Sequence, residues 1–217
     1  MGEQLPTSLD TNVADAFLAA LADGRLCLHP TDTVPGLTFD SHSAKSRDGL
    51  AALKRRDGAK PVLALCADLS RALTCFAPLP GDWEKRLARL WPGPLSVIWR
   101  AAPGAPAALV AADGTIGLRV PQLTDDVAWF ADVLRRWPEP LPTTSANHSQ
   151  QPPATRWADA AAFVADSVDA FVPPMDAEPA SRTVPSTVIR LHEDGGFDIL
   201  RQGALPAHML DAAGSPA

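Results

Sequence analysis

Polar side chains that could hold a small substrate follow the first predicted strand of the chain. The segment Pro30-Thr31-Asp32-Thr33 places two hydroxyls and a carboxylate on a loop that proline stiffens. Ligands commonly bind at strand ends in sheets flanked by helices, where Thr or Asp can fix a small polar molecule. A plain turn is the alternative, because the same residue types favour turns.

A second polar segment, Thr143-Thr144-Ser145-Ala146-Asn147-His148-Ser149, follows another short predicted strand. Its donors and acceptors suit a ribose, a phosphate or a carboxylate. An Asx or Ser/Thr turn, or a helix N-cap, is the alternative reading of the same residues. We interpret His148 as an exposed loop histidine.

Cations that could bind phosphate lie at Lys54-Arg55-Arg56, with Lys60 shortly after. Lys54 and Arg56 are two residues apart and cannot share one helix face, but both could converge on a phosphate if the helix ends there. The planar fork of Arg and the point charge of Lys both suit polyphosphate. A solvated helix end, where cations complement the macrodipole, is the alternative.

A third kind of candidate is an arginine inside an apolar strand. Arg119 stands in Gly117-Leu118-Arg119-Val120-Pro121, with Thr115 just upstream. Its side chain points either into a cleft or outward, and a buried ion pair is the structural alternative. Near the end of the chain, Pro185-Ser186-Thr187-Val188-Ile189 and Ile199-Leu200-Arg201-Gln202-Gly203 add a hydroxyl and a cation to a predicted hairpin.

Common catalytic motifs are missing from the sequence. It contains no GxxxxGK[ST] loop, no GxGxxG, no HExxH and no GxSxG. The five histidines are dispersed and the three cysteines form no CxxC pair, so we assign no metal ion to protein side chains and no disulfide framework. A nucleotide site in this chain needs another design.

The bulk composition is that of one globular domain. The chain has 217 residues, 46% of them hydrophobic, and a net charge of −6. That charge argues against a surface that binds nucleic acid throughout, although a local basic cleft remains compatible with it. There is no secretory signal and no apolar run of about 18 residues, so we expect a cytoplasmic protein with no membrane partner.

The elements that must position these residues mix helices and strands without strict alternation. Helices are predicted over about 12–23 with Thr11 or Asn12 as cap, 44–56, a short segment after Asp68, from Asp82 to Trp91, from Thr124 or Asp125 to Arg136, and 157–166. Strands are predicted over 26–28, 61–66, 95–99, 116–120, 141–145 and a hairpin of 186–191 with 197–201. This pattern predicts an α/β or α+β sheet of mixed strand direction. We expect one domain over 1–217, with a core of about 12–206 and frayed termini.

Taken in order, these segments resemble the YrdC-like family. Its members carry P-T-[ED]-T-x-Y-G-L, K-x-R before K-P, W-P-G-P-[LY]-[ST], G-[LV]-R-[VI]-P, S-A-N-x-S, and S-T-[VI] with a late L-R-x-G. This chain has PTDTVPGL, KRR with KP, WPGPLS, GLRVP, SANHS, and STVI with LRQG, from Pro30 to Gly203. It corresponds to the short form, without the extra C-terminal domain of longer members.

The resemblance implies a twisted mixed sheet with flanking helices around a basic cleft. It also implies a threonylcarbamoyl-AMP synthase, a nucleotidyltransferase that joins L-threonine, bicarbonate or CO2 and ATP and releases pyrophosphate, with Mg2+ on the phosphates. The product feeds the threonylcarbamoyladenosine modification of tRNA through a separate tRNA threonylcarbamoyl transferase.

Site residues follow from the same resemblance, position by position. Lys54, Arg56 and Arg119 are implied to be catalytic. Threonine contacts are implied for Thr31, Arg119, Thr143 and Ser186, and ATP contacts for Lys54, Arg56, Lys60, Thr115, Ser145, Asn147 and Arg201. The carbamate formed from threonine is the nucleophile, so no protein nucleophile is needed.

Three departures from the family pattern leave other functions open. Pro35 replaces the usual Tyr, Gln150 replaces the Gly that usually follows the serine of the S-A-N-x-S loop, and a polar residue is missing after Lys60-Pro61. A catalytically weak paralogue that binds double-stranded RNA or tRNA through the cleft is one alternative. A nucleotide-responsive regulatory protein is the other.

Overall fold

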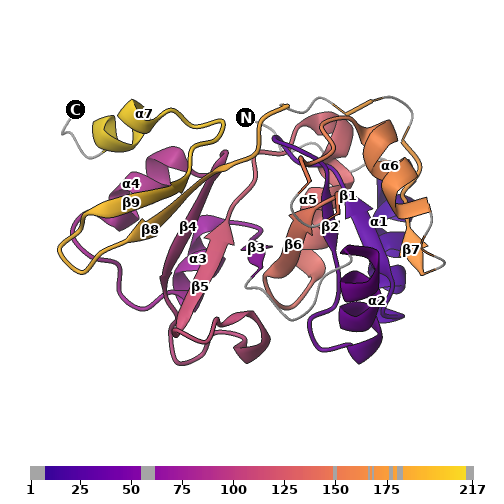
Figure 1. The fold of residues 1–217 in the computed structure, drawn as a ribbon, viewed down its shortest axis with the longest axis horizontal. Helices are drawn as coiled ribbons and strands as arrows, with labels where there is room; N and C mark the ends of the chain where they lie inside the picture. Colours follow the sequence, from indigo (N-terminus) through magenta and orange to yellow (C-terminus); the bar gives the residue numbers. More distant parts are fainter. Residues whose placement is uncertain are drawn as a thin grey trace.

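The computed structural model describes residues 8–54, 62–148, 151–165, 167, 169–175, 178–179 and 183–213, with the side chains of 8–11 and 211–212 excepted. Over these ranges the chain forms one nine-stranded sheet in the order β7-β1-β2-β6-β3-β5-β4-β8-β9 (Figure 1). The strands are β1 Leu26–His29, β2 Gly36–Thr38, β3 Leu63–Leu65, β4 Leu95–Arg100, β5 Thr115–Arg119, β6 Leu141–Ser145, β7 Ala170–Phe171, β8 Thr187–Leu191 and β9 Phe197–Arg201.

Strand directions are mixed, as the irregular alternation of elements predicts. β1 pairs with β7, β3 with β5 and β4 with β8 in parallel, whereas β1–β2, β2–β6, β3–β6, β4–β5 and β8–β9 are antiparallel. The predicted C-terminal hairpin is confirmed by the antiparallel pair β8–β9. The predicted α+β sheet of mixed direction is therefore correct.

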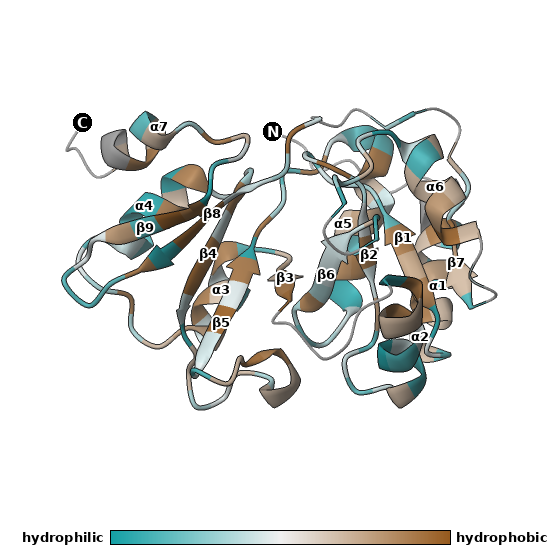
Figure 2. Cartoon of the chain, in the orientation of Figure 1, coloured by the Kyte–Doolittle hydropathy of each residue, from teal (hydrophilic) through white to brown (hydrophobic). Residues whose placement is uncertain are grey.

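The helices are α1 Ser8–Ala22, α2 Ala44–Lys54, α3 Leu69–Cys75, α4 Trp83–Leu90, α5 Ala128–Arg136, α6 Trp157–Ala165 and α7 Ala207–Ala212, with short 3-10 turns at Ala107–Leu109 and Asp125–Val127. Helices pack on both faces of the sheet around β1, whereas α3 and α4 lie on one face of β4 and β5 (Figure 1). In Figure 2 α2 and α6 change between teal and brown along their length, as helices with one buried face do.

Strand β1 is buried on both faces, which explains its uninterrupted apolar run. Cys27 packs in a core with Phe17 of α1 and Phe130 of α5. Leu28, on the opposite face, packs in a separate core with Trp157 of α6. The strand is thus held between α1 and α5 on one side and α2 and α6 on the other, which fixes the loop that leaves its end.

A second half of the sheet has its own core. Strands β4, β5 and β8 bury their apolar residues against α3, α4 and α7, with the fully buried Trp83 among them. Short strand β3 lies between β5 and β6 and so joins the two halves. Residues from both halves can therefore meet near β3.

The predicted start of α1 is wrong, and two predicted side-chain caps are not formed. Helix α1 begins at Ser8, so Thr11 and Asn12 lie inside it rather than at its start. Asp82 makes no capping bond, since its carboxylate accepts from Arg86 Nε at 2.6 Å instead. Thr124 likewise donates to a neighbouring carboxylate and α5 starts through a 3-10 turn. The cap at Asp68 is correct, because its side chain accepts the N–H of Arg71.

Two further expectations need correction. The loop predicted over Pro30–Leu37 is partly a strand, because Gly36 and Leu37 belong to β2, which pairs with both β1 and β6. The C-terminus is ordered as helix α7 up to Ala212, and Leu210 of that helix is fully buried. Apolar packing of Leu210 and Ala213, together with the hydrogen bond from Arg89 to the carbonyl of Ala213, holds this segment, which its position near the terminus alone would leave frayed.

Over the described residues, no helix combines the length and apolar character that crossing a bilayer requires.

Candidate functional site

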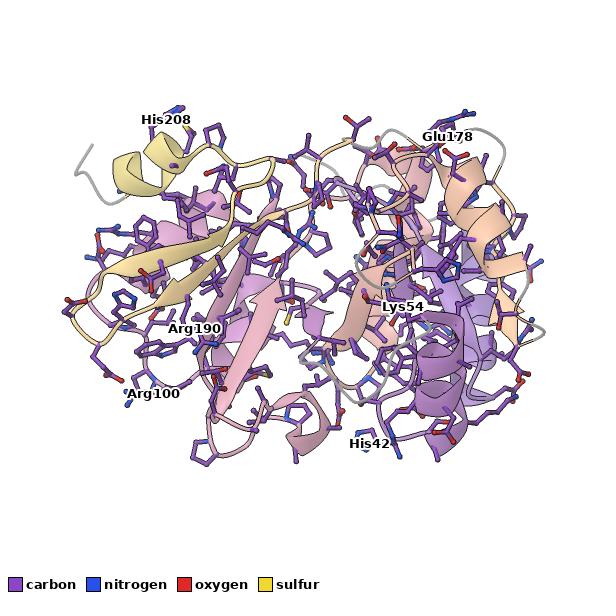
Figure 3. The ribbon with its side chains drawn as sticks, in the orientation of Figure 1. His42, Lys54, Arg100, Glu178, Arg190 and His208 are labelled. Atoms are coloured by element: carbon purple, nitrogen blue, oxygen red, sulfur yellow. The ribbon has the colours of Figure 1, made fainter. Side chains whose placement is uncertain are left out.

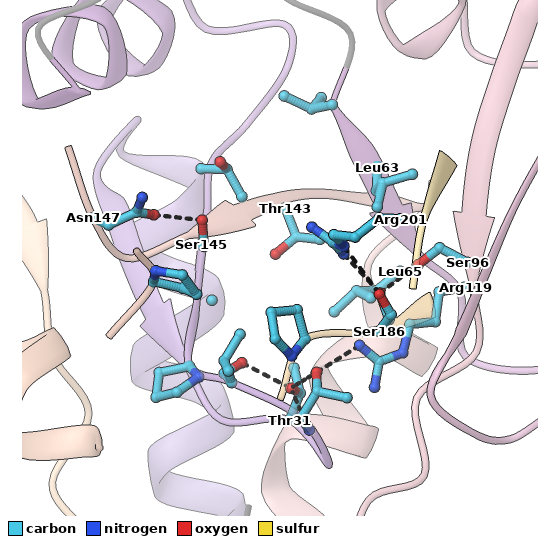
Figure 4. A pocket seen from close by; sticks show the side chains of 18 of the residues that line it. Thr31, Leu63, Leu65, Ser96, Arg119, Thr143, Ser145, Asn147, Ser186 and Arg201 are labelled. Carbon is cyan, nitrogen blue, oxygen red and sulfur yellow. Dashed lines mark hydrogen bonds between the residues drawn. The ribbon is translucent and has the colours of Figure 1, made fainter. Parts of the chain in front are cut away.

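A cavity of about 390 Å3 lies where the two halves of the sheet meet (Figure 4). Its lining residues come from the loop after β1, from β3 to β6 and from the C-terminal hairpin. They are Thr31, Thr33, Val34, Pro35, Gly36, Val62, Leu63, Leu65, Ser96, Arg119, Thr143, Thr144, Ser145, Asn147, Gln151, Pro153, Pro185, Ser186 and Arg201. Two arginines, Arg119 and Arg201, stand among these lining residues, and Asp32 forms an ion pair with the first of them.

Arg119 closes one wall of the cavity at the end of β5. Its guanidinium donates to the carbonyl of Gly93 at 3.1 Å, to Thr33 Oγ1 at 2.8 Å and to the carboxylate of Asp32. Arg119 is buried, and burial lowers its pKa while Asp32 opposes that change. Both sequence readings hold together: Arg119 forms a buried ion pair and also lines the cavity. A guanidinium carries five N–H donors, more than these three partners require.

The Thr31-Asp32-Thr33 loop is held by a directed chain of hydrogen bonds. Thr31 Oγ1 donates to the carbonyl of Val34 at 2.9 Å, because a carbonyl can only accept. Thr33 Oγ1 must therefore donate to Thr31 Oγ1 at 3.0 Å, which leaves it an acceptor for Arg119. The loop and the arginine thus fix one another, and Pro30 limits the entry of the chain.

The C-terminal hairpin supplies a second cationic group on the same side. Arg201 donates from Nε to the carbonyl of Ser186 and from Nη2 to its hydroxyl, both at 3.1 Å. The hydroxyl of Ser186 also contacts Ser96 Oγ at 2.9 Å. Parallel pairing of β4 with β8 brings Ser96 and Ser186 together across 90 residues of sequence.

The predicted phosphate ligands Ser145 and Asn147 line the opposite wall, and Lys54 contacts them from outside the lining. Lys54, the last residue of α2, is buried and donates from Nζ to the carbonyl of Ser145 at 2.6 Å and to Asn147 Oδ1 at 3.4 Å. The hydroxyl of Ser145 donates to the same Asn147 oxygen. Figure 3 shows Lys54 in the region between α2 and β6. The Lys54 ammonium therefore lies against the polar segment that follows β6.

A buried histidine supports the wall between these two groups. His29 Nε2 lies 2.8 Å from Thr143 Oγ1, and its Nδ1 lies 3.2 Å from the carbonyl of Pro30. The ring stacks on Phe130 with 4.5 Å between centroids. The pKa of His29 is lowered to about 4. Burial is the main cause and the charge of Arg119 contributes in the same direction, while the hydrogen bond to the Pro30 carbonyl opposes both.

Among the predicted ligands in the described part of the chain, Lys54 and Thr115 do not line this cavity, and Thr115 also lies away from the residues that do. It sits at the other end of β5 from Arg119 and lines a neighbouring cavity of about 330 Å3 with Asp113 and Arg190. The two cavities share Val62 and Leu63 on their walls. Thr115 donates to Asp113 Oδ1 at 2.6 Å.

Three predicted features fall outside the described residues: the phosphate contacts of Arg56 and Lys60 and the effect of Gln150. The other two departures can be located. Pro35 lines the cavity where the family pattern has Tyr, and Leu63 and Leu65 present apolar side chains after the Lys60-Pro61 pair. The part of the cavity lined by Pro35, Leu63 and Leu65 is therefore apolar.

Sequence reasoning missed Ser96 and His29 and misplaced His148. Ser96 is the last residue of the WPGPLS segment, and this family motif could have indicated that Ser96 lies near the site. His29 directly precedes the polar loop, but its partner Thr143 is 114 residues away, so no local pattern reports the pair. His148 is half-buried rather than exposed, with Nδ1 3.2 Å from the carbonyl of Leu53 and its ring edge-on to Phe163.

Within the ranges that the structure describes, no three acidic, imidazole or thiol side chains gather as a metal site. The three cysteines are free and buried, as expected of structural thiols. The cavity volume is that of a small-molecule site rather than a groove for a duplex.

Comparison with known proteins agrees with this geometry. The profile of the Sua5/YciO/YrdC family, described as "Telomere recombination", matches residues 19–203. A threonylcarbamoyl-AMP synthase of Halorhodospira halophila is 30% identical over 155 residues, which cover 71% of this chain and 79% of the relative.

Solved structures share the fold. P. abyssi Sua5 complexed with L-threonine superposes with a TM-score of 0.78 at 22% identity, over 97% of this chain but only 58% of that protein. E. coli YciO gives a TM-score of 0.74 at 18% identity and matches over 94% of this chain and 95% of its own. On its motifs, its sheet and its profile match, the chain belongs to the Sua5/YciO/YrdC family.

Proposed function

We propose that the protein is an L-threonylcarbamoyladenylate synthase. One observation carries the proposal: a single cavity has Arg119 and Arg201 on one wall and Ser145 and Asn147 on the facing wall, and the buried Lys54 ammonium contacts both of these residues from outside the lining. Such a site can hold a carboxylate at one end and a polyphosphate at the other.

The reaction needs positioning more than protein chemistry. The amine of L-threonine adds CO2 and loses a proton, giving a carbamate. A carbamate oxygen then attacks the α-phosphorus of ATP, a new P–O bond forms, the bond to the β-phosphate breaks, and pyrophosphate leaves. Holding both reactants in line and neutralising the charge on the leaving group are the contributions a protein makes to such a step.

Each wall has a distinct role in the proposed mechanism. Arg119 and Ser186 hold the threonine carboxylate, with Thr31 and Thr143 completing the amino-acid subsite. Phosphates bind on the opposite side through Lys54, Ser145 and Asn147, with Arg56 and Lys60 as further contacts and Arg201 contacting them from the Arg119 wall, and Thr115 binds the nucleoside end in the adjoining cavity. Mg2+ would supply charge neutralisation on the phosphates, and no cluster of acidic side chains in the described residues is assigned to hold it.

Two sets of relatives support the substrate assignment. The Halorhodospira protein is named a threonylcarbamoyl-AMP synthase, and the P. abyssi protein was crystallised with L-threonine. The product of this reaction is an activated acyl group that a separate transferase would deliver to tRNA. A cytoplasmic location follows from that partnership and stays a prediction.

The decisive experiment measures pyrophosphate release and the adenylate product from ATP, bicarbonate and Mg2+ with and without L-threonine. Threonine-dependent turnover supports the synthase. Folded protein that binds ATP without turnover contradicts it and favours a nucleotide-responsive regulator. Double-stranded RNA binding is not proposed, because the cavity is of small-molecule size and the net charge of −6 opposes a polyanion.

A further inference from the structure

His29 and Thr143 form a hydrogen bond whose direction the surrounding atoms determine. The Pro30 carbonyl, 3.2 Å from His29 Nδ1, can only accept, so Nδ1 must carry the ring proton. Burial keeps the ring neutral at pH 7, since it lowers the pKa to about 4. A neutral imidazole with its proton on Nδ1 has a lone pair on Nε2.

The consequence falls on Thr143. Its Oγ1 lies 2.8 Å from that lone pair, so the hydroxyl proton must point at His29. The Thr143 side chain, which lines the cavity beside Arg201 and Ser186, then offers only oxygen lone pairs to whatever binds there (Figure 4). A hydroxyl that could otherwise donate or accept is thereby restricted to accepting.

The backbone is built around this bond. His29 of β1 and Gly36 of β2 are register partners, and the hydroxyl of Thr143 in β6 also approaches this glycine, although the register partner of Gly36 in β6 is Ser145. A Cβ on Gly36 would lie 2.5 Å from His29 Nε2 and 2.8 Å from Thr143 Oγ1. The bond therefore passes through the space that a side chain at residue 36 would occupy, so a glycine at this position leaves room for it. Phe130, stacked on the ring, limits the other side.

We infer that His29 is a positioning residue that makes Thr143 an obligatory hydrogen-bond acceptor, so that this point of the cavity selects an N–H or O–H donor of the amino-acid substrate. The inference rests on the proposed function for the identity of that substrate. Arg119 and Ser186 lie on their side of the cavity and suit the carboxylate, as proposed above. An acceptor at Thr143 instead suits the amino nitrogen or the side-chain hydroxyl, which fixes the amino acid in one orientation.

The first test uses the unmodified protein. Long-range 1H–15N correlation of the histidine rings at pH 7.5 reports which nitrogen is protonated, and His29→Phe identifies the signal by its loss. We expect a proton on Nδ1 and a lone pair on Nε2. A proton on Nε2 would make Thr143 free to donate to a ligand and would overturn the inference. This readout requires neither substrate nor activity.

The second test measures binding of L-threonine, L-2-aminobutyrate and 3-hydroxybutyrate, which lack the hydroxyl and the amino group respectively. The wild type should bind threonine more tightly than one of the two analogues. Weaker binding of L-2-aminobutyrate identifies the hydroxyl as the donor to Thr143, and weaker binding of 3-hydroxybutyrate identifies the amino group. His29→Phe and Thr143→Val should each reduce this preference by about tenfold, the effect of about one hydrogen bond, with ATP affinity unchanged. Equal weakening of threonine and both analogues would overturn the inference.

A double-variant cycle separates positioning from general packing. If His29 acts through Thr143, His29→Phe should have no further effect on the preference in the Thr143→Val protein. Additive effects would contradict that route. His192→Phe, an exposed histidine paired with Asp198, is the matched control. A protein that binds no amino acid contradicts the proposed function. The measured His29 tautomer would then still show whether the Thr143 hydroxyl is restricted to accepting, without identifying a substrate.

Discussion

The side-chain nitrogen of Lys54 lies 2.6 Å from the carbonyl oxygen of Ser145, across 91 residues of sequence. The contact joins the end of α2 to the end of β6, and Lys54 is buried as it makes it. A buried ammonium is costly without partners, so this position requires both the carbonyl and Asn147. The same arrangement presents a cation beside the hydroxyl and amide that would meet a phosphate.

Replacing Lys54 by Met should remove that cation while keeping much of the side-chain volume. We expect catalytic efficiency with ATP to fall by about 2–4 kcal/mol in transition-state stabilisation, because charge on the leaving phosphates is no longer neutralised. Pyrophosphate release at varied ATP measures the effect. Lys45→Met is the control, since Lys45 is exposed and pairs with Asp169 at 3.2 Å. Equal activity of the two variants would remove Lys54 from the proposed site.

Arg119→Lys should be severe although it preserves charge. A lysine cannot reach Gly93, Thr33 and Asp32 together, and the buried Asp32 carboxylate loses its partner geometry. We expect a loss of about 3–5 kcal/mol in the free energy of unfolding and no threonine-dependent turnover. Urea unfolding tests stability. Arg100→Lys, at an exposed pair with Glu193, should change little. A stable, active Arg119→Lys protein would contradict the role of the guanidinium fork.

Gly36→Ala should destabilise the protein by steric conflict. The added methyl would lie 2.4 Å from His29 Cε1, inside contact distance, and the ring is enclosed by Phe130. Forcing atoms into a packed core typically costs about 1–3 kcal/mol. Thermal unfolding should show the loss. Gly104→Ala, where an added Cβ meets nothing within 4 Å, is the matched control. Unchanged stability of Gly36→Ala would show that strand β2 can move away from His29.

His29 should also make the folded state sensitive to acid. Its pKa falls from 6.5 to about 4 on folding, so the unfolded chain binds more protons between these values. Stability therefore falls as pH drops through this window, by about 3 kcal/mol in total, and not further below it. Urea unfolding of wild type and His29→Phe at pH 7.5 and 4.5 measures the difference. The variant should lose less stability on acidification, and an equal loss would contradict the assignment.

The sequence alone determines the fold class, the family and most of the candidate site. Mixed elements without strict alternation predict a mixed sheet, and six ordered motifs identify the polar loop at Thr31, the cation at Lys54 and the hairpin at Ser186. These signals are local, because turn chemistry, apolar runs and short motifs depend on neighbouring residues. Element ends are less well determined, as the start of α1 at Ser8 shows, because packing and the surrounding chain decide where a helix begins.

Only the tertiary structure decides which polar groups face one another. Arg119 and Asp32, His29 and Thr143, and Ser96 and Ser186 are between 87 and 114 residues apart, and strand pairing brings each pair together. Their hydrogen bonds then fix charge, tautomer and hydroxyl direction, which no residue type specifies by itself. Thr115 shows the converse, because strand β5 carries it into the adjoining cavity, away from Arg119. The chemistry of this site thus depends on contacts between segments that are far apart in the sequence. The fold, by contrast, can be predicted from patterns among residues that are close together in the sequence.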